Sequence, residues 1–368
     1  MTTTPNAVLA GTIRCTSTSG ALFLLLMGLG SALVGQDARA WGENGSGQCN
    51  VPALPAGLSY VEVTGGREHT VARRSDGTVV AVGGNGFGQC NVWVLPPGLS
   101  YVEVAAGAYH TVARRSDGTV VAWGYNGLGQ CNVPPLPGTL SYVEVAAGGD
   151  HTVARRSDGT VVAWGQNSQG ECNVPTPPAG LIYLEVAAGG GQTAARRSDG
   201  TVVVWGDNFW GQWNVPALPA GLTYVEVAAG FAHLVARRSD GTVVAWGANY
   251  YGQCNVPALP AGLSYVEVDG GRDHTVARRS DGTVVAWGDN AYGQRDVPAL
   301  PAGSSYVGVA GGFYHTMAVV QSGSYETFGS GCAGSQPTAN LTNLHLPRLG
   351  QSLLVQVNHL PHSLALMV

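Results

Sequence analysis

The stretch that decides the fold is residues 101–141, YVEVAAGAYHTVARRSDGTVVAWGYNGLGQCNVPPLPGTLS, because a nearly identical stretch follows it at residues 142–182. The spacing that separates Tyr101 from Tyr142 is repeated over most of the chain. A fixed period of this length is the signature of a repeat architecture in which each repeat is one supersecondary unit. The Trp-Gly pair recurs at Trp41, Trp123, Trp164, Trp205, Trp246 and Trp287, with Val82-Gly83 in the gap, and the opening tyrosine recurs at Tyr60, Tyr101, Tyr142, Tyr183, Tyr224, Tyr265 and Tyr306.

Each unit predicts four short strands. In the quoted unit, alternating side chains predict strands over residues 101–105, 110–115 and 119–123, and a short fourth strand over 130–133. Ser116-Asp117-Gly118 predicts a tight hairpin turn, and Pro134 ends the fourth strand. Four antiparallel strands in about 40 residues are the size of a propeller blade.

The number of repeats predicts a closed ring. Seven steps of the repeat spacing, counted from Trp41, lead to Phe328, which is followed by Gly329. We therefore expect an all-β, seven-bladed propeller of four-stranded blades over residues 41–329. Its first strand, with Gln48–Val51, would complete the last blade, so that the ring has no open sheet edge.

The two ends of the chain differ from the repeats. Residues 1–40 resemble a signal peptide, with Arg14 before the apolar run 21–34 and a small-residue cleavage site at Ala38-Arg39-Ala40, or one nearer Gly35. We expect a secreted or cell-surface protein with no membrane span once the signal is removed. Residues 330–368 predict a short, incomplete C-terminal β segment.

The repeat resembles that of the regulator-of-chromosome-condensation family. The resemblance rests on WGxNxxGQ and AAGxxHTVARRSDG, covers residues 41–329, and implies a seven-bladed propeller. The export signal and compact repeats place the chain closer to secreted bacterial members, such as propeller-type β-lactamase inhibitory proteins, than to the nuclear exchange factor. Cys-Asn-Val-Pro stands where the family usually has Leu-Gly, and no exchange-factor loop is recognisable.

Three recurring polar positions are interpreted as structural. The histidines spread around the ring axis, whereas a zinc site needs three or four converging ligands. The cysteines lie too far apart in adjacent blades for disulfides and are expected to be buried thiols. The Arg pairs beside Ser-Asp-Gly are expected to form a rim whose charge is compensated by acidic neighbours. The positions are His69, His110, His151, His233, His274 and His315, with Gln192 in the remaining unit; Cys49, Cys90, Cys131, Cys172 and Cys254, with Trp213 and Arg295; and pairs such as Arg73-Arg74.

The units differ from one another mainly in the two residues before each histidine and in the loop after each Trp-Gly pair. In an up-and-down blade both loops emerge on the same face, so we expect one nearly uniform face and one varied face. Exposed aromatic residues on loops are typical of interaction surfaces. The candidate binding residues on the varied face are Phe87, Tyr109, Tyr125, Phe209, Trp210, Phe231, Tyr250, Tyr251, Tyr292, Phe313 and Tyr314, with Leu128 beside them.

The sequence favours a monomeric binding protein for an extracellular or cell-surface protein, peptide or glycan. A net charge of −5 argues against nucleic acid as a partner. We find no catalytic motif and predict no enzyme activity, cofactor or metal. The first alternative is an extracellular polymer-degrading hydrolase or lyase with acidic residues in the central funnel; the second, guanine-nucleotide exchange, follows from the family name alone. The acids offered for the first alternative are Glu43, Glu68, Asp150, Asp207, Asp273 and Asp289.

Overall fold

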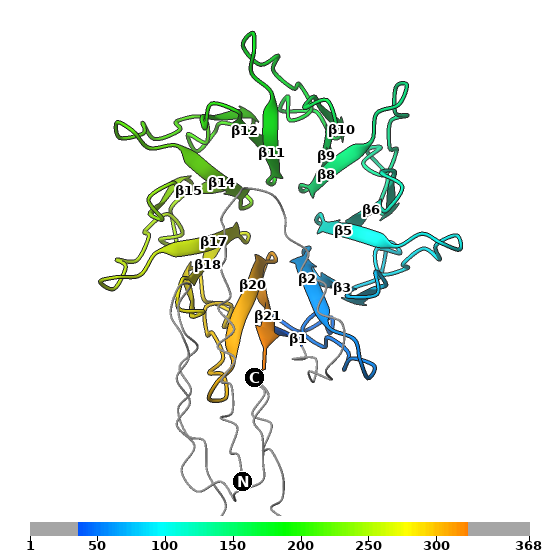
Figure 1. Ribbon diagram of the computed structural model, residues 1–368, viewed down its shortest axis with the longest axis vertical. Coiled ribbons are helices and arrows are strands. Elements are labelled where there is room, and N and C mark those ends of the chain that lie inside the picture. The colour runs from blue at the N-terminus through cyan, green and yellow to red at the C-terminus, as the bar shows by residue number, and fades with distance from the viewer. Residues whose placement is uncertain (1–35, 323–368) are drawn as a thin grey trace, which may run out of the picture. The chain divides into compact units, whose positions relative to one another are not determined.

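A computed structural model describes residues 36–322, and within this range every regular element is a β-strand. The strands form seven three-stranded antiparallel sheets, which Figure 1 shows arranged like blades around a central axis. The predicted all-β architecture and its seven repeats are confirmed. No helix in residues 36–322 has the length and hydropathy that crossing a membrane requires.

The three strands of a blade occupy equivalent positions in every repeat. The innermost strands are β2 (Tyr60–Gly65), β5 (Tyr101–Ala106), β8 (Tyr142–Ala147), β11 (Tyr183–Ala188), β14 (Tyr224–Ala229), β17 (Tyr265–Gly270) and β20 (Ser305–Gly311). The middle strands are β3 (His69–Arg74), β6 (His110–Arg115), β9 (His151–Arg156), β12 (Gln192–Arg197), β15 (His233–Arg238), β18 (His274–Arg279) and β21 (His315–Gln321). The outer strands are β4 (Val79–Gly83), β7 (Val120–Gly124), β10 (Val161–Gly165), β13 (Val202–Gly206), β16 (Val243–Gly247), β19 (Val284–Gly288) and β1 (Gln36–Gly42).

The predicted fourth strand is absent from the described blades. In the second blade, residues 130–133 form a turn instead, in which Asn126 Oδ1 accepts a hydrogen bond from the Cys131 N–H at 2.9 Å. The next two N–H groups, of Asn132 and Val133, donate to the carbonyls of Gly129 and Cys131. These local bonds use the donors that a fourth ladder would need, so the prediction of four-stranded blades was wrong.

The last blade is completed by the N-terminal strand. β1 pairs antiparallel with β21 from Gln36 opposite Gln321 to Gly42 opposite His315. Because β20 occupies the other edge of β21, Trp41-Gly42 takes the third-strand place that the repeat count gave to Phe328. Phe328 and the predicted segment 330–368 lie outside the described residues. Because β1 pairs with β21 from Gln36 onward, residues 36–40 belong to the propeller, although the predicted boundary was residue 41.

The core lies between neighbouring blades. In one such interface, Val71 of β3 packs with Tyr101, Val104 and Trp123 of the next blade. The buried ring of Trp123 donates its indole N–H to the Gln89 carbonyl at 2.9 Å, and the Tyr101 hydroxyl donates to Trp93 O. A buried tyrosine–tryptophan pair holds six of the seven interfaces together, since aromatic side chains bury about 150–250 Å² each. In the interface of Tyr60 the tryptophan is replaced by Val82.

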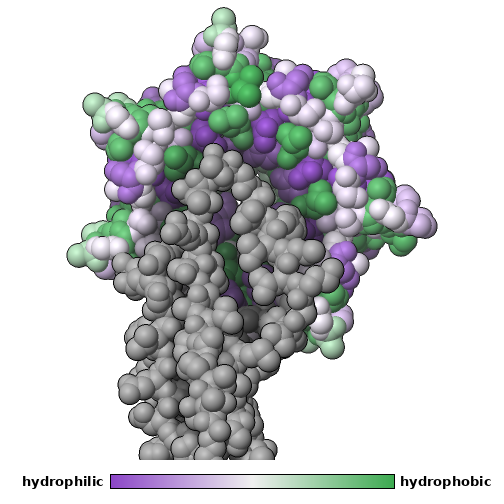
Figure 2. All heavy atoms as spheres, in the orientation of Figure 1, coloured by the Kyte–Doolittle hydropathy of each residue, from purple (hydrophilic) through white to green (hydrophobic). Residues whose placement is uncertain are grey.

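The innermost strands surround a central cavity of about 390 Å³. Its wall is formed by small residues of these strands together with Glu62, Glu103, Glu267 and Asp269. Figure 2 shows the face that carries the turns between the middle and the outer strand of each blade, where hydrophilic residues recur from blade to blade.

Candidate binding face

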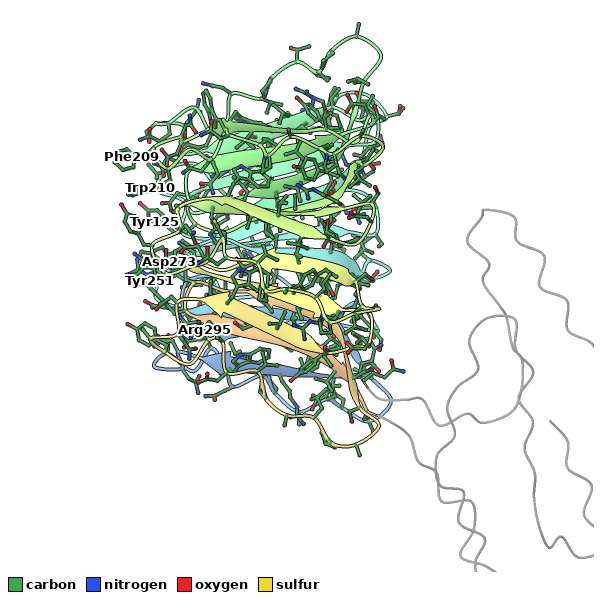
Figure 3. The ribbon with its side chains drawn as sticks, turned by 90° about the vertical axis from the view of Figure 1, so that its left-hand side faces the viewer. Tyr125, Phe209, Trp210, Tyr251, Asp273 and Arg295 are labelled. Atoms are coloured by element: carbon green, nitrogen blue, oxygen red, sulfur yellow. The ribbon has the colours of Figure 1, made fainter. Side chains whose placement is uncertain are left out.

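The two varied loops of each unit lie against each other on one face. In the second blade the Tyr125 N–H, just after Trp-Gly, donates to the carbonyl of Tyr109, just before His110, at 2.8 Å. The same bond recurs in the other units, for example from Asp207 to Gly191 and from Glu43 to Tyr314 across the ring closure. Figure 3 shows Tyr125, Phe209, Trp210 and Tyr251 along one side of the molecule. Side chains that are apart in sequence are therefore neighbours on this face.

A ring of backbone hydrogen bonds fixes the inner edge of this face. The first varied residue of each unit donates its N–H to the equivalent loop of the next unit, as in Ala108 to Gly149 at 3.1 Å. The ring closes where Phe313 N–H donates to Gly66 O at 3.0 Å. Because these bonds involve only backbone atoms, the side chains at the same positions are free to differ between units.

Most of the candidate aromatic residues are exposed, but to different extents. Tyr109, Tyr125, Phe313 and Tyr314 are partly buried. The exposed ones are Phe87 (51%), Phe209 (78%), Trp210 (37%), Phe231 (41%), Tyr250 (73%), Tyr251 (58%) and Tyr292 (52%), with Leu128 beside them (47%).

The aromatic residues form three separate groups. The Phe87 group consists of Phe87 with Tyr109 and Tyr125, at ring-centroid distances of 5.2 and 5.0 Å. Tyr109 also lies under the Arg67 guanidinium. Edge-to-face contacts of this kind hold the exposed rings in fixed orientations.

The Trp210 group consists of Phe209, Trp210 and Tyr250. Trp210 meets Phe209 edge-on at 4.6 Å and Tyr250, from the next unit, edge-on at 4.9 Å. Since Phe209 and Tyr250 are mostly exposed, this group is the most prominent apolar feature of the face.

The Phe231 group lies at the mouth of the central cavity. Phe231 contacts Phe313 at 5.5 Å, Tyr314 contacts Tyr292 at 5.2 Å, and the Arg272 guanidinium lies over Phe231 and Tyr314. Phe231, Arg272 and Phe313 all line the cavity. These rings are partly engaged with one another and with the cation, so they have a structural role as well as an exposed edge.

Sequence reasoning placed one exposed aromatic residue among the structural positions. Trp213 stands where other units have cysteine, and its side chain is 51% exposed. The signal that could have found it is the single replacement of a small, partly buried residue by tryptophan.

The histidines link neighbouring blades. His151 Nε2 lies 2.9 Å from Thr193 Oγ1 of the next blade, and the other five make the same contact. All six are fully buried, and burial lowers the pKa of His151 to about 4. In the remaining interface, between β12 and β15, both partners change together, to Gln192 and Leu234. Among residues 36–322 no histidine belongs to a group of ligands that could hold a metal.

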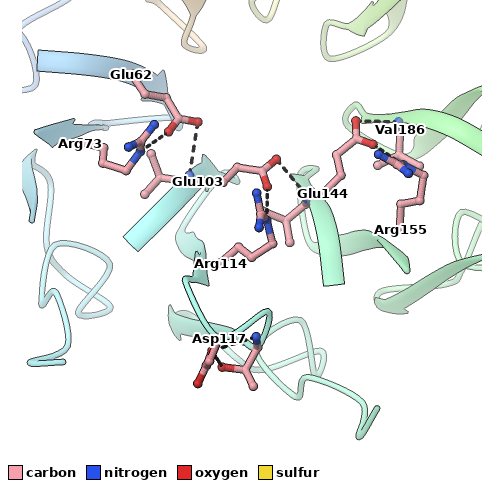
Figure 4. A network of polar contacts seen from close by, with 11 residues as sticks. Glu62, Arg73, Glu103, Arg114, Asp117, Glu144, Arg155 and Val186 are labelled. Atoms are coloured by element: carbon pink, nitrogen blue, oxygen red, sulfur yellow. Dashed lines mark hydrogen bonds and ion pairs between the residues drawn. The ribbon is translucent and has the colours of Figure 1, made fainter. Parts of the chain in front are cut away.

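The first arginine of each pair is part of a second inter-blade network, drawn in Figure 4. Arg114 Nε donates to Glu103 Oε2 at 2.7 Å, while Glu103 Oε1 accepts from the Val145 N–H of the next blade at 3.2 Å. The innermost-strand glutamates therefore compensate the first arginine of each pair. Asp117 of the turn accepts from Thr119 N–H and Oγ–H, and its charge interacts with the second arginine, Arg115.

Burial raises the pKa of four of these glutamates, Glu62, Glu144, Glu185 and Glu226. It raises the pKa of Glu185 to about 7, although the Arg196 guanidinium beside it acts in the opposite direction. The seventh blade lacks the pair altogether, because Gly308 and Val319 occupy the two facing positions.

The cysteines at the recurring position are free thiols. Cys172 Sγ lies 3.0 Å from the carbonyl of Gln166, and the other four donate to equivalent loop carbonyls. Burial raises the pKa of Cys172 to about 12. These contacts agree with the interpretation of the cysteines as structural, but all five side chains are half-buried rather than buried as predicted.

The acids offered for a hydrolase do not all meet at one site, although Asp273 and Asp289 are neighbours: the Asp289 N–H donates to the Asp273 carbonyl at 2.8 Å. Asp150 Oδ1 accepts from the side-chain amide of Gln130 at 3.2 Å, Asp207 Oδ2 from that of Gln212 at 3.0 Å, and Asp289 Oδ2 from that of Gln294 at 2.9 Å. The cavity is instead lined by other acids, three of which, Glu62, Glu103 and Glu267, are paired with arginine. The location predicted for catalytic acids in the funnel was therefore wrong.

Comparisons with known proteins agree with the repeat and the fold. Five units, at residues 60–89, 101–130, 142–171, 224–253 and 265–294, match the family model described as the regulator of chromosome condensation (RCC1) repeat. A comparison with curated protein sequences gives no match.

Several solved structures share the fold at low sequence identity. Human WBSCR16 is 17% identical with a TM-score of 0.65, over 78% of this chain and 99% of that one. Prp20p from Saccharomyces cerevisiae, described with its binding properties to Gsp1p and histones, is 18% identical with a TM-score of 0.67, over 80% and 93%. The ectodomain of the receptor kinase CR4 from Physcomitrella patens is 21% identical with a TM-score of 0.54, over 69% and 68%.

Proposed function

Since five of its units match the RCC1 repeat, we propose that this chain is an exported binding module whose varied loop face holds a protein, peptide or glycan. The observation that carries the proposal is the contrast between the two faces. The repeats are nearly identical in their strands and Ser-Asp-Gly turns, yet each unit presents different side chains on the loop face.

The exposed aromatic residues supply the binding energy in this proposal. Phe209, Tyr250 and Tyr251 are each more than half exposed, and aromatic anchors of this kind dominate the energetics of interfaces. They are mounted on loops that are held by backbone hydrogen bonds within and between blades. Rigid anchors lose little conformational entropy on binding.

The export part of the proposal rests on the amino-terminal sequence. Residues 21–34 form an apolar core preceded by Arg14, as in a signal peptide. The comparison with the secreted β-lactamase inhibitory proteins stays a prediction. A hydrolase is disfavoured because the acids of the loop face serve as acceptors for neighbouring glutamine side chains.

The test is affinity capture from culture supernatant and cell-surface extract with the mature chain as bait. The aromatic variant replaces Trp210, Tyr250, Tyr251 and Tyr292 by Ala. A matched control replaces Val94 and Ile182, exposed apolar residues outside the loop face, by Ala. Circular dichroism first establishes that all three proteins are folded.

We expect a partner that is captured by the native chain and by the control but is lost from the aromatic variant. Equal capture by the native chain and the aromatic variant, or capture by neither, contradicts the proposal.

A further inference from the structure

One buried position under the loop face differs from its equivalents in the charge it carries. In four units a buried glutamine donates its side-chain amide to a carboxylate; Gln130, for example, donates to Asp150, twenty residues further on, at 3.2 Å, and Gln253 donates to Asp273 at 3.4 Å. Glutamate replaces this glutamine once, at Glu171. In two of the four units the carboxylate lies twenty residues after the glutamine, and in the other two it lies five residues before it. The equivalent positions around Glu171 are Gly191 and Gln166, so neither carries a carboxylate.

The Glu171 carboxylate is buried with one oxygen unused. The residue is fully buried, and Oε2 accepts from the Gln169 N–H at 2.8 Å. Oε1 has no hydrogen-bond partner among the described residues. A buried polar atom without a partner is costly, and a carboxylate needs a donor because it can only accept.

The space next to this carboxylate is left open by glycine. A Cβ at Gly191 would have Asp207 Cβ at 3.5 Å and Gln169 Cγ at 3.9 Å as its nearest neighbours, which are ordinary contact distances. A side chain would therefore fit, and the other six units have one there. Gln169, which covers the space from one side, is exposed and free to rotate. We call the space bounded by Gln169, Glu171, Gly191 and Asp207 the notch.

The surroundings of the notch are acidic and aromatic. Asp207 adds a second carboxylate, and the loops of this unit and the preceding one, residues 165–171, 189–192 and 206–212, contain no arginine or lysine. Phe209 and Trp210 follow Asp207 closely along the chain. On the inner side, Phe231 lies against Gly190, where a Cβ would come within 2.7 Å of its ring.

We propose that the notch binds a basic side chain, arginine or lysine, of a protein partner. This proposal rests on the proposed function and deepens it. Rotation of Gln169 opens the notch, and the cation donates to Glu171 Oε1 and to the Asp207 carboxylate. Charge-assisted hydrogen bonds of this kind are about twice as strong as neutral ones. The adjacent aromatic rings favour a cation further.

The test measures binding of fluorescein-labelled hexa-arginine and hexa-lysine peptides by fluorescence anisotropy, with hexa-glutamate as the negative probe. Glu171→Gln restores the residue of the other units and is expected to keep or raise the melting temperature, so a loss of binding does not report unfolding. Gly191→Ala fills the notch without changing charge. Asp150→Asn is the matched control, since it removes a carboxylate at the position equivalent to Gly191 in the preceding unit, beside Gln130 rather than beside a glutamate.

We expect Glu171→Gln and Gly191→Ala each to weaken binding of the basic peptides at least tenfold, and Asp150→Asn to change it less than twofold. The proposal is overturned by any of three results: equal losses of binding in all three variants, unchanged binding in Glu171→Gln, or no binding by the native chain. A captured partner that is a glycan also overturns it. If a partner is lost from the aromatic variant but is still bound by Glu171→Gln, the proposed function is supported and the proposal for the notch is contradicted.

Discussion

His110 Nε2 lies 3.0 Å from Thr152 Oγ1 in the next blade, and the Thr152 hydroxyl donates to the Gln130 carbonyl at 2.8 Å. Because the only hydroxyl proton goes to the carbonyl, threonine accepts the proton of His110 Nε2. The other ring nitrogen, Nδ1, is buried without a partner among the described residues. Burial lowers the pKa of His110 to about 3, so the imidazole remains neutral in the folded propeller.

Acid is therefore expected to destabilise the propeller through its blade interfaces. An unfolded histidine binds a proton near pH 6.5, whereas the folded one does so only near pH 3, so its contribution to stability is lost as pH falls from about 6.5 towards 3. Glu185 and Asp269, whose pKa values burial raises to about 7, contribute with the opposite sign.

A variant that copies the interface of Gln192 and Leu234 isolates the contribution of the histidine to the pH dependence of stability. His110→Gln with Thr152→Leu reproduces Gln192 and Leu234, and its free energy of unfolding in urea should fall less between pH 7 and pH 5. The difference from the native chain should reach about 1–2 kcal/mol at pH 5. Parallel pH curves for the two proteins would contradict this role of His110.

The glutamate–arginine network is expected to show coupling between its partners. Glu103→Gly alone leaves Arg114, which is largely buried, without its carboxylate and should lower the free energy of unfolding by about 2–3 kcal/mol. The double variant with Arg114→Val copies Gly308 and Val319 of the last blade and should be less destabilised than the sum of the single changes. Additive effects in a double-mutant cycle would show that the ion pair contributes no coupling.

The aromatic groups should separate by their effects on folding. Phe209→Ala removes a mostly exposed ring and should change the free energy of unfolding by less than about 0.5 kcal/mol. Phe231→Ala removes contacts with Phe313 and the Arg272 guanidinium, so its effect should be larger. Thermal denaturation compares the two, and equal shifts would show that both rings are free or both are structural.

The position of β1 sharpens the expectation for signal removal. Cleavage after Ala40 would remove Ala38, which is buried in the core, and most of the pairing with β21. We expect the mature chain to begin at or before Gln36, as measured by intact mass of the secreted protein. A chain that begins at Trp41 should melt at a lower temperature than one that begins at Gln36. A mature end at Trp41 with unchanged melting would show that β1 is dispensable.

The free thiols should be protected by the fold. Burial raises the pKa of Cys90 and Cys131 to about 11 and that of Cys254 to about 12, so little thiolate exists at pH 8. Reaction of the native chain with a disulfide reagent at pH 8 should be slow and should become fast in denaturant. Rapid reaction of the folded protein would show that these thiols are accessible to solvent and would contradict the prediction.

The sequence by itself determined the repeat, the strand order within a blade and the face on which the units vary. These properties are local or periodic, and a constant repeat spacing with alternating side chains is visible without coordinates. The sequence pattern also indicated that His69 and its equivalents are structural. The pattern wrongly predicted a fourth strand at residues 130–133. There the side-chain oxygen of Asn126 accepts the hydrogen bond from the Cys131 N–H that a strand would donate to its neighbour.

Only the tertiary structure decided which residues meet across blades and across the closure of the ring. Trp41 completes a blade whose other two strands, β20 and β21, come from the opposite end of the described chain, and Glu103 reaches the Val145 N–H of a neighbouring sheet. The unused oxygen of Glu171 also appears only when neighbouring loops are packed together. These relationships depend on distances between side chains far apart in the sequence, and those distances are set by closure of the ring rather than by the pattern of any one repeat.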